Sequence, residues 1–413
     1  MSETSAGASS SEAMRENAGA GATAKSVKPS KVEDTKLASN YLHGFVAEEV
    51  LNGKSHFSEE AYNILKFHGS YQQDDRDLRT QRKKEGKDKA YSMMLRSRIP
   101  GGKLTAEQYL VHDELARNHG NATLRITTRQ SFQLHGVLKD DLGKVIRAIN
   151  ESLLSTLAAC GDVERNVLCC PAPIHDAIRS EMQSDTDRFA SHFAPRTNSY
   201  WEIWLDGEKI DNPLLPPAGP TLVPTAQDTA VEPIYGQMYL PRKFKTAFAL
   251  PEDNCVDVLA NDLGFLAVVE AGVLQGYNVT VGGGLGTTPS TDKTFPMLGL
   301  PLCFTSRADL LKVAEGIIKV YRDLGNRSDR KRARIKYVIH DLGLAAFRAK
   351  VEEYLGETLP APKAVHVHEV DDHLGWREQG DGKLMLGLPV ENGRVHDVGD
   401  YRLLSGLRAY FQK

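Results

Sequence analysis

The sequence predicts an α+β protein in which a ferredoxin-like unit of strands and helices precedes a larger α/β region. Residues 91–159 alternate between strand and helix patterns in the order β-α-β-α, which is half of a ferredoxin-like layer. Residues 160–355 contain further strand-like and helix-like segments. Residues 383–410 then repeat the outline of residues 91–117, so we expect a second copy of the unit that has only begun.

Length and composition exclude several classes of protein. At 413 residues, with 41% hydrophobic and 25% charged residues, the chain is long enough for two or more ordinary globular domains. The net charge of -3 argues against a general nucleic-acid-binding protein, and no apolar run approaches the ~18 residues of a membrane span. The five cysteines include no C-x-x-C and no Cys/His pair at zinc spacing, so we expect a reducing, cytoplasmic location.

The N-terminal part is predicted to contain a tail and a charged arm. Residues 1–36 are rich in Ser, Ala, Gly and Glu, a composition typical of a disordered tail. Residues 37–90 are predicted to be helical and charged. Within them Ser58 is placed to cap a helix over residues 58–66, and residues 72–84 form a charged run typical of a solvated arm.

The first ferredoxin-like unit, residues 91–159, divides into four elements. Residues 91–98 predict a strand, and the Ile-Pro-Gly-Gly sequence that follows predicts a turn. Residues 105–119 predict a capped helix, residues 124–136 the second strand, and residues 142–159 the second helix.

The rest of the chain predicts an α/β region, a linker and the second unit. The expected strands are residues 200–205, 244–250, 265–270 and 277–281, and the expected helices are residues 309–323 and 343–354. A Pro-rich loop over residues 211–232 is long enough to predict a functional or surface excursion. Residues 356–380 predict the linker and residues 381–413 the second unit. We expect that the sequence is truncated at Lys413, before a counterpart of residues 124–136.

Residues 124–136 combine an apolar face with a hydrogen-bonding face. Except at Thr128 and Gln130, one alternate set is apolar, and the other set is Arg125, Thr127, Arg129, Ser131, Gln133 and His135. Successive strand residues point to opposite faces of a sheet. The polar face is therefore either the solvated side of an antiparallel sheet or a site for several carboxylates or phosphates, which Arg binds bidentately.

Three further basic clusters favour an anion site. Arg96 and Arg98 share one face of a predicted strand, and Arg165 lies in a mostly apolar segment. Lys243 and Lys245 share one face at the start of an apolar strand. Charges beside apolar strands tend to be paired or functional.

Three consecutive glycines, Gly282, Gly283 and Gly284, follow a predicted strand. A dinucleotide-binding loop would need a helix directly after them, whereas a polar loop interrupted by proline follows here. The glycines better suit a backbone that a bulky planar ligand can approach closely.

Five motifs, taken together and in this order, carry a family resemblance. They are Met94-Leu-Arg-Ser-Arg-Ile-Pro-Gly-Gly102, residues 124–136, Arg165-Asn-Val-Leu-Cys169, Leu240-Pro-Arg-Lys-Phe-Lys-Thr246 and Val281-Gly-Gly-Gly-Leu285. The chain from about residue 37 to residue 413 resembles the assimilatory sulfite reductase hemoproteins. These are the siroheme-containing β subunits of NADPH-dependent sulfite reductase, which are related to nitrite reductases. Residues 66–79, 201–209 and 325–331 look particularly like the NADPH-dependent type.

The resemblance implies cofactors, a reaction and residue roles. Siroheme, an iron tetrapyrrole with many carboxylates, would contact Arg125, Thr127, Arg129, Gln133 and His135, with Arg242 and the three glycines assisting. The implied catalytic residues, which bind sulfite and supply charge and protons, are Arg96, Arg165, Lys243 and Lys245. The implied reaction is the six-electron reduction of sulfite to hydrogen sulfide, with a flavoprotein subunit or ferredoxin as electron donor.

The cysteines depart from the family pattern. The 4Fe-4S cluster of the family takes four thiolates in two close pairs, and none of the five cysteines has that spacing. We therefore expect no metal ligands in this chain, cluster cysteines beyond Lys413, and no activity of the 413-residue chain alone. The alternatives are a siroheme nitrite reductase and a non-catalytic, truncated siroheme-binding chain. The net acidity disfavours a protein that binds phosphate or nucleic acid through its basic strand.

Overall fold

The computed structural model describes residues 28–208, 210 and 231–413. Most of the predicted tail and nearly all of the predicted loop over residues 211–232 lie outside them. The tail prediction is wrong for its last residues, because helix α1 (Lys31–Ala38) begins there. Lys36 of this helix is buried and lies 3.4 Å from Asp162, and Glu33 is ion-paired with Arg327, so ion pairs hold the helix in place.

The arm that follows contains helices and one unpredicted strand. Its helices are α2 (Val46–Val50), α3 (Glu59–Leu65) and α4 (Arg76–Lys84). Ser58 caps α3 as predicted, since its side chain accepts a hydrogen bond from the Ala61 N–H. The expectation of a wholly helical arm is wrong at β1 (Ser70–Asp74), which pairs antiparallel with the next strand over its whole length. Pairing with a neighbouring strand outweighs the weak strand propensity of Gln and Asp.

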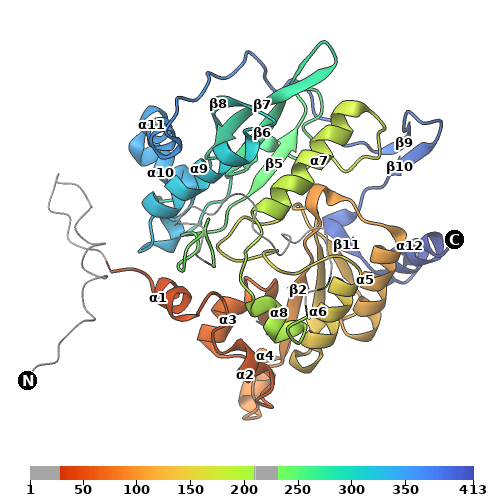
Figure 1. Ribbon diagram of the computed structural model, residues 1–413. Coiled ribbons are helices and arrows are strands. Elements are labelled where there is room, and N and C mark those ends of the chain that lie inside the picture. The colour runs from red at the N-terminus through yellow and green to blue at the C-terminus, as the bar shows by residue number, and fades with distance from the viewer. Residues whose placement is uncertain (1–27, 209, 211–230) are drawn as a thin grey trace, which may run out of the picture.

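A five-stranded antiparallel sheet has the order β1-β2-β4-β3-β11. Its other strands are β2 (Tyr91–Arg96), β3 (Leu124–Ile126), β4 (Phe132–Val137) and β11 (Arg394–Val395). Helices α5 (Ala106–Asn118) and α6 (Leu142–Glu151) lie side by side on one face of it (Figure 1). Thr105 and Gln108 form a capping box at the start of α5, which confirms that helix. The second helix is shorter than predicted, because the exposed Leu153 has a φ of 63° and residues 154–159 continue as an irregular buried segment.

The single strand predicted over residues 124–136 is wrong, because β3 and β4 form a hairpin. Residues 127–131 make the turn between them, and Gln130 has a φ of 47°. Leu124 pairs with Leu134, and Arg125 with Gln133. Because apolar residues pair with apolar residues and polar with polar across the hairpin, the predicted polar face is present on both strands.

The larger region contains a second sheet of order β5-β6-β7-β8. Its strands are β5 (Thr246–Ala249), β6 (Leu263–Glu270), β7 (Val273–Val281) and β8 (Leu300–Ser306). β5 and β6 run parallel and the other pairs antiparallel. Three of these strands confirm predictions, and β8 was not predicted. The helices of this region are α7 (Ala177–His192), α9 (Leu310–Leu324), α10 (Ile335–Leu342) and α11 (Leu344–Leu355), of which α9 and α11 were predicted.

Residues 200–205, a predicted strand, instead lie largely in helix α8 (Ser199–Trp204). Aromatic and branched side chains favour a strand locally. Tyr200, Trp201 and Trp204 are nevertheless all buried, at a spacing that one helical face satisfies.

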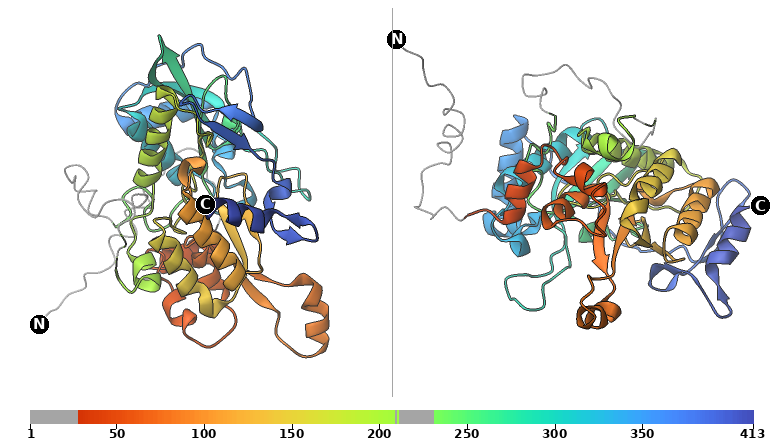
Figure 2. Two further views of the ribbon diagram at one scale, coloured as in Figure 1. Left: turned by 90° about the vertical axis from the view of Figure 1, so that its right-hand side faces the viewer. Right: turned by 90° about the horizontal axis from the view of Figure 1, so that it is seen from below.

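The C-terminal residues form short strands followed by one helix, and their reading as a second copy of the first unit stays a prediction. β9 (Gly375–Glu378) and β10 (Leu384–Gly387) form an antiparallel pair, and helix α12 (Leu403–Phe411) follows the short strands β11, β12 (Asp397–Val398) and β13 (Tyr401–Arg402). β11 extends the first sheet beside β3. α12 packs on α5, where Arg408 is ion-paired with Asp113 and Glu114. Figure 2 shows these segments, in blue, together on one side of the molecule.

One continuous apolar core joins the helices and both sheets. Among the described residues, no helix is both long and apolar enough to cross a membrane.

Candidate functional site

Four predicted site residues share one face of the five-stranded sheet. Arg96 of β2 lies opposite Gln133 of β4, and Gln133 lies opposite Arg125 of β3, so the three side chains form a row. The Gln133 amide sits between two of its neighbours, and hydrogen bonding assigns its orientation: the oxygen accepts from Arg96 Nε at 3.1 Å and the nitrogen donates to His135 Nε2 at 3.2 Å. This is the hydrogen-bonding face that the sequence predicted.

This face carries positive charge that the protein itself does not neutralise. Arg96 donates a hydrogen bond to Cys160 Sγ at 3.1 Å instead of to a carboxylate. Within the described part of the chain, the Arg125 side chain has no ion pair or hydrogen bond. Burial, followed by the charges of Arg125 and Arg96, lowers the pKa of His135 to about 4. His135 is therefore neutral near pH 7 and can donate or accept a hydrogen bond.

Two lysines near the hairpin turn are partly buried and have no ion-pair partner among the described residues. Lys243 and Lys245 occupy alternate positions in the segment that leads into β5, so they lie on the same side. Burial and then Arg165 lower the pKa of Lys243 to about 8, and burial and then Arg129 lower the pKa of Lys245 to about 7. Neither ammonium has an ion pair or a hydrogen-bond partner among the residues that the structure describes. Such groups would be stabilised by a bound anion.

A neighbouring pocket of about 280 Å³ contains more cations than carboxylates. Lys66, Arg165, Arg242 and Arg330 line it, and Asp162 is the only acid among its lining residues. Asp162 lies 2.9 Å from Arg330 and 3.8 Å from Arg242. Burial and then Arg330 lower the pKa of Lys66 to about 8. Sequence reasoning missed Lys66 and Arg330, although both lie in segments that carry the family resemblance.

Arg129 and Thr127 lie in the hairpin turn, away from the row of side chains on the sheet. The Arg129 guanidinium donates to Asn166 O at 3.0 Å, to Thr246 O at 3.3 Å and to Asn261 Oδ1. The Thr127 hydroxyl accepts a hydrogen bond from the Arg129 N–H at 3.2 Å. Arg129 thus fastens the turn to β5, and direct contact of either residue with siroheme stays a prediction.

The backbone requires glycine at Gly282 and Gly283, whereas Gly284 faces a side chain. Gly282 has a φ of 89°, and a Cβ at Gly283 would collide with Leu259 O. A Cβ at Gly284 would lie 2.9 Å from Arg334 Nη2. Arg334 donates to Asp262 Oδ1 at 2.7 Å, close to the partly buried lysines. The glycine loop therefore borders the basic site, and its contact with a cofactor stays a prediction.

Arg98 lies away from the site, so the expectation that it shares a face with Arg96 is wrong. It follows the end of β2, is 1% exposed and donates to Ala190 O at 2.7 Å. Because β2 ends at Arg96, the alternation of side chains between the two faces does not continue to Arg98, and this side chain points into the core.

The cysteines do not gather into a four-thiolate site. All five are free, and in the described residues only Cys170 and Cys255 join a cluster of metal-ligand side chains, with Asp253 and His373. The described residues therefore do not fit a 4Fe-4S cluster, which takes four thiolates. Sequence spacing could not reveal the mixed cluster, because its members come from three distant segments.

The donor chemistry of the basic site does fit siroheme. Guanidinium groups, ammonium groups and neutral hydrogen-bonding side chains lie on this sheet face and around the pocket lined by Arg165, with one carboxylate among the pocket residues. A multiply charged carboxylate ligand would satisfy groups that the protein leaves unpaired.

Two parts of the chain match models of known protein families. Residues 84–152 match the family model described as nitrite/sulfite reductase ferredoxin-like half domain. Residues 184–359 match the model described as nitrite and sulphite reductase 4Fe-4S domain.

Curated relatives cover nearly the whole chain. One from Anoxybacillus flavithermus, named sulfite reductase (NADPH) hemoprotein beta-component, is 46% identical over 388 residues, which are 94% of this chain and 66% of the relative. One from Synechococcus elongatus, named sulfite reductase (ferredoxin), is 44% identical and covers 94% of this chain and 62% of its own length. The chain thus spans less than two thirds of either relative.

A solved structure shares the fold. The Mycobacterium tuberculosis NirA protein aligns with a TM-score of 0.63 and 24% identity, over 93% of this chain and 63% of that one. The α+β prediction is confirmed by this likeness and by the half-domain match. From its two domain matches and its relatives, the chain belongs to the nitrite and sulfite reductase family.

Proposed function

We propose that the basic site binds siroheme and sulfite, and that the protein reduces sulfite to hydrogen sulfide with six electrons. The observation that carries the proposal is the pair Lys243 and Lys245, two partly buried amines that have neither an ion pair nor a hydrogen bond within the described chain. The names of the relatives support sulfite as the substrate.

The residues proposed to hold siroheme are those on the sheet face and around it. They are Arg125, Thr127, Arg129, Gln133, His135, Arg242, Gly282, Gly283 and Gly284. When bound, siroheme and an iron–sulfur cluster supply the electron transfer. Because the described thiols do not fit the cluster, we assign it no residue of this chain.

The residues proposed to act on sulfite are Arg96, Arg165, Lys243 and Lys245. Each places a positive charge where sulfite oxygens could be held, and such fixed charges stabilise negative charge that develops on oxygen. The oxygens of sulfite leave as water, which consumes protons. With pKa values of about 8 and about 7, Lys243 and Lys245 can each give up a proton near neutral pH.

The electron donor that we propose is a flavoprotein subunit supplied by NADPH, as the name of the Anoxybacillus relative indicates. Ferredoxin is the alternative that the cyanobacterial relative indicates. Five free cysteines support a reducing, cytoplasmic location.

Nitrite reduction is the second candidate, because the family includes both enzymes. The excess of cations favours sulfite, which carries more negative charge than nitrite when both are fully ionised.

Binding measurements test the proposal without requiring turnover. The chain is produced in cells that make siroheme, and sulfite is titrated while the siroheme absorption is recorded. The variant Lys245→Met should keep siroheme but bind sulfite ~10–100-fold more weakly, the loss expected for one hydrogen bond to a charged group. Lys312→Met, which removes an exposed lysine paired with Glu357, is the control and should bind sulfite like the unmodified chain. Equal sulfite affinity in all three proteins would overturn the assignment of Lys245, and tighter binding of nitrite would favour the second candidate.

A further inference from the structure

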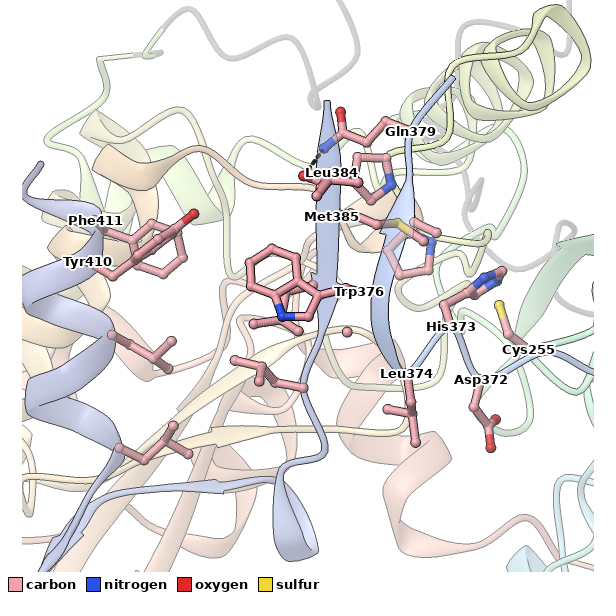
Figure 3. Close-up of a pocket in the computed structure, with 18 of the residues that line it drawn as sticks. Cys255, Asp372, His373, Leu374, Trp376, Gln379, Leu384, Met385, Tyr410 and Phe411 are labelled. Atoms are coloured by element: carbon pink, nitrogen blue, oxygen red, sulfur yellow. Dashed lines mark hydrogen bonds between the residues drawn. The ribbon is translucent and has the colours of Figure 1, made fainter. Parts of the chain in front are cut away.

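Cys170, Asp253, Cys255 and His373 bring four metal-ligand side chains together outside the basic site. One ligand atom from each lies within 4.8 Å of the other three. Cys170 follows the segment that contains Arg165, Asp253 and Cys255 follow β5, and His373 precedes β9. In Figure 3 the Cys255 thiol and the His373 imidazole lie side by side at one edge of a pocket, whereas Asp372 points away.

The distances suit one small ion. His373 Nε2 lies 3.2 Å from Cys170 Sγ and 3.1 Å from both carboxylate oxygens of Asp253. Ligand bonds of about 2.0–2.3 Å in a tetrahedron give edges of roughly 3.3–3.8 Å between ligand atoms. The observed contacts are shorter by only a few tenths of an ångström, so small side-chain movements would admit the ion.

The surrounding groups orient these ligands. Asp371 Oδ2 lies 3.4 Å from His373 Nδ1, close to it but without a hydrogen bond, while Nε2 faces the cluster. Asp371 Oδ1 also accepts a hydrogen bond from the His373 N–H at 2.9 Å. Arg179 donates to Asp253 Oδ2 at 3.0 Å and leaves Oδ1 free to bind. Carboxylate support of a ligating histidine is typical of metal sites.

Burial and charge also favour a cation. Cys170, Asp253 and His373 are buried, and Cys255 is partly exposed. With both thiols ionised, the two thiolates and one carboxylate carry more negative charge than the Arg179 guanidinium balances. A divalent cation would offset this charge, because buried charges require partners.

We propose that Cys170, Asp253, Cys255 and His373 bind one Zn²⁺ ion in a structural site. Two thiolates, an imidazole and a carboxylate are zinc ligands, and four protein ligands leave no open position for chemistry. The ion fastens the segment before β9 to the loop after β5. The His368 N–H donates to Pro251 O at 2.9 Å, so the same two segments already touch. This site is independent of siroheme and sulfite binding.

Metal analysis of the whole chain, purified under reducing conditions, tests the site. We expect about one zinc ion per chain after dialysis against a weak chelator. Cys255→Ser and His373→Ala should each lose most of this zinc. Cys169→Ala, which removes the buried neighbouring thiol outside the cluster, should keep it. His373→Cys replaces one zinc ligand with another and should restore binding.

Cobalt provides a readout that does not depend on how well the variants fold. Co²⁺ added to the metal-free chain should give thiolate-to-cobalt absorption bands, and Zn²⁺ should abolish them. The proposal is overturned if the unmodified chain holds no more zinc than Cys255→Ser and shows no such bands. It is also overturned if Cys170 and Cys255 are recovered as a disulfide from protein kept under reducing conditions and trapped by alkylation.

Discussion

Replacing Lys245 with methionine should stabilise the unliganded protein. The pKa of Lys245 falls from 10.5 to about 7, mainly through burial, so its charged form is disfavoured in the folded chain. At ~1.36 kcal/mol per pKa unit, this difference corresponds to ~5 kcal/mol. Relaxation and hydration around the neighbouring cations reduce the effect, so we expect Lys245→Met to raise the free energy of unfolding by roughly 2–4 kcal/mol at pH 6.

The pH dependence of this gain identifies its cause. Between about pH 7 and pH 10.5 the unfolded chain holds a proton that folded Lys245 has lost, so the unmodified protein gains stability as pH rises. The difference in unfolding free energy between Lys245→Met and the unmodified protein should therefore be largest below pH 7 and vanish near pH 10.5. Urea unfolding from pH 6 to pH 10 measures it, with Lys312→Met as an exposed control that should change stability by less than ~1 kcal/mol. If Lys245→Met does not raise the free energy of unfolding, or raises it equally at every pH, then the burial of a charged Lys245 does not destabilise the protein.

Three further changes have defined outcomes. Asp162→Asn removes the carboxylate that pairs with Lys36 and Arg330, and it should lower the free energy of unfolding in urea by about 3 kcal/mol. An unchanged urea midpoint would show that these two ion pairs do not stabilise the fold. Gly283→Ala places a Cβ against Leu259 O and should cost ~1–3 kcal/mol; a wild-type melting temperature would mean that the loop moves freely. Arg125→Glu should reduce the siroheme retained after gel filtration at least ~10-fold, because it puts a negative charge beside the cofactor carboxylates; full retention would remove Arg125 from the site.

Local signals predicted the elements that local interactions determine. The capping box at Thr105, the cap at Ser58 and the apolar periodicity of α9 all lie within a few residues of the helices that they predict. The hairpin over residues 124–137 was missed because its turn contains neither Gly nor Pro. The two exceptions to the alternation, Thr128 and Gln130, both lie in that turn and were the only signal of it.

The sequence could predict those site residues whose sheet face follows from their odd or even position along a strand. Arg96, Arg125, Gln133 and His135 share a face because each occupies a strand position of the right parity. Residues placed by tertiary packing were not predictable in this way. Arg129 turns to bind backbone carbonyls, α8 forms where strand-favouring residues stand, and Cys170 meets His373 across 203 positions of sequence.

The central proposal is that partly buried cations without anionic partners bind a tetrapyrrole with many carboxylates. The most direct test is to titrate the purified chain, with its metal content known, with siroheme and with haem, which has fewer carboxylates. We expect siroheme to bind more tightly than haem, and we expect this advantage to shrink as salt rises from ~0.05 M to ~0.5 M and the Debye length falls. Equal affinity for the two tetrapyrroles, or a preference for siroheme that salt leaves unchanged, would contradict it.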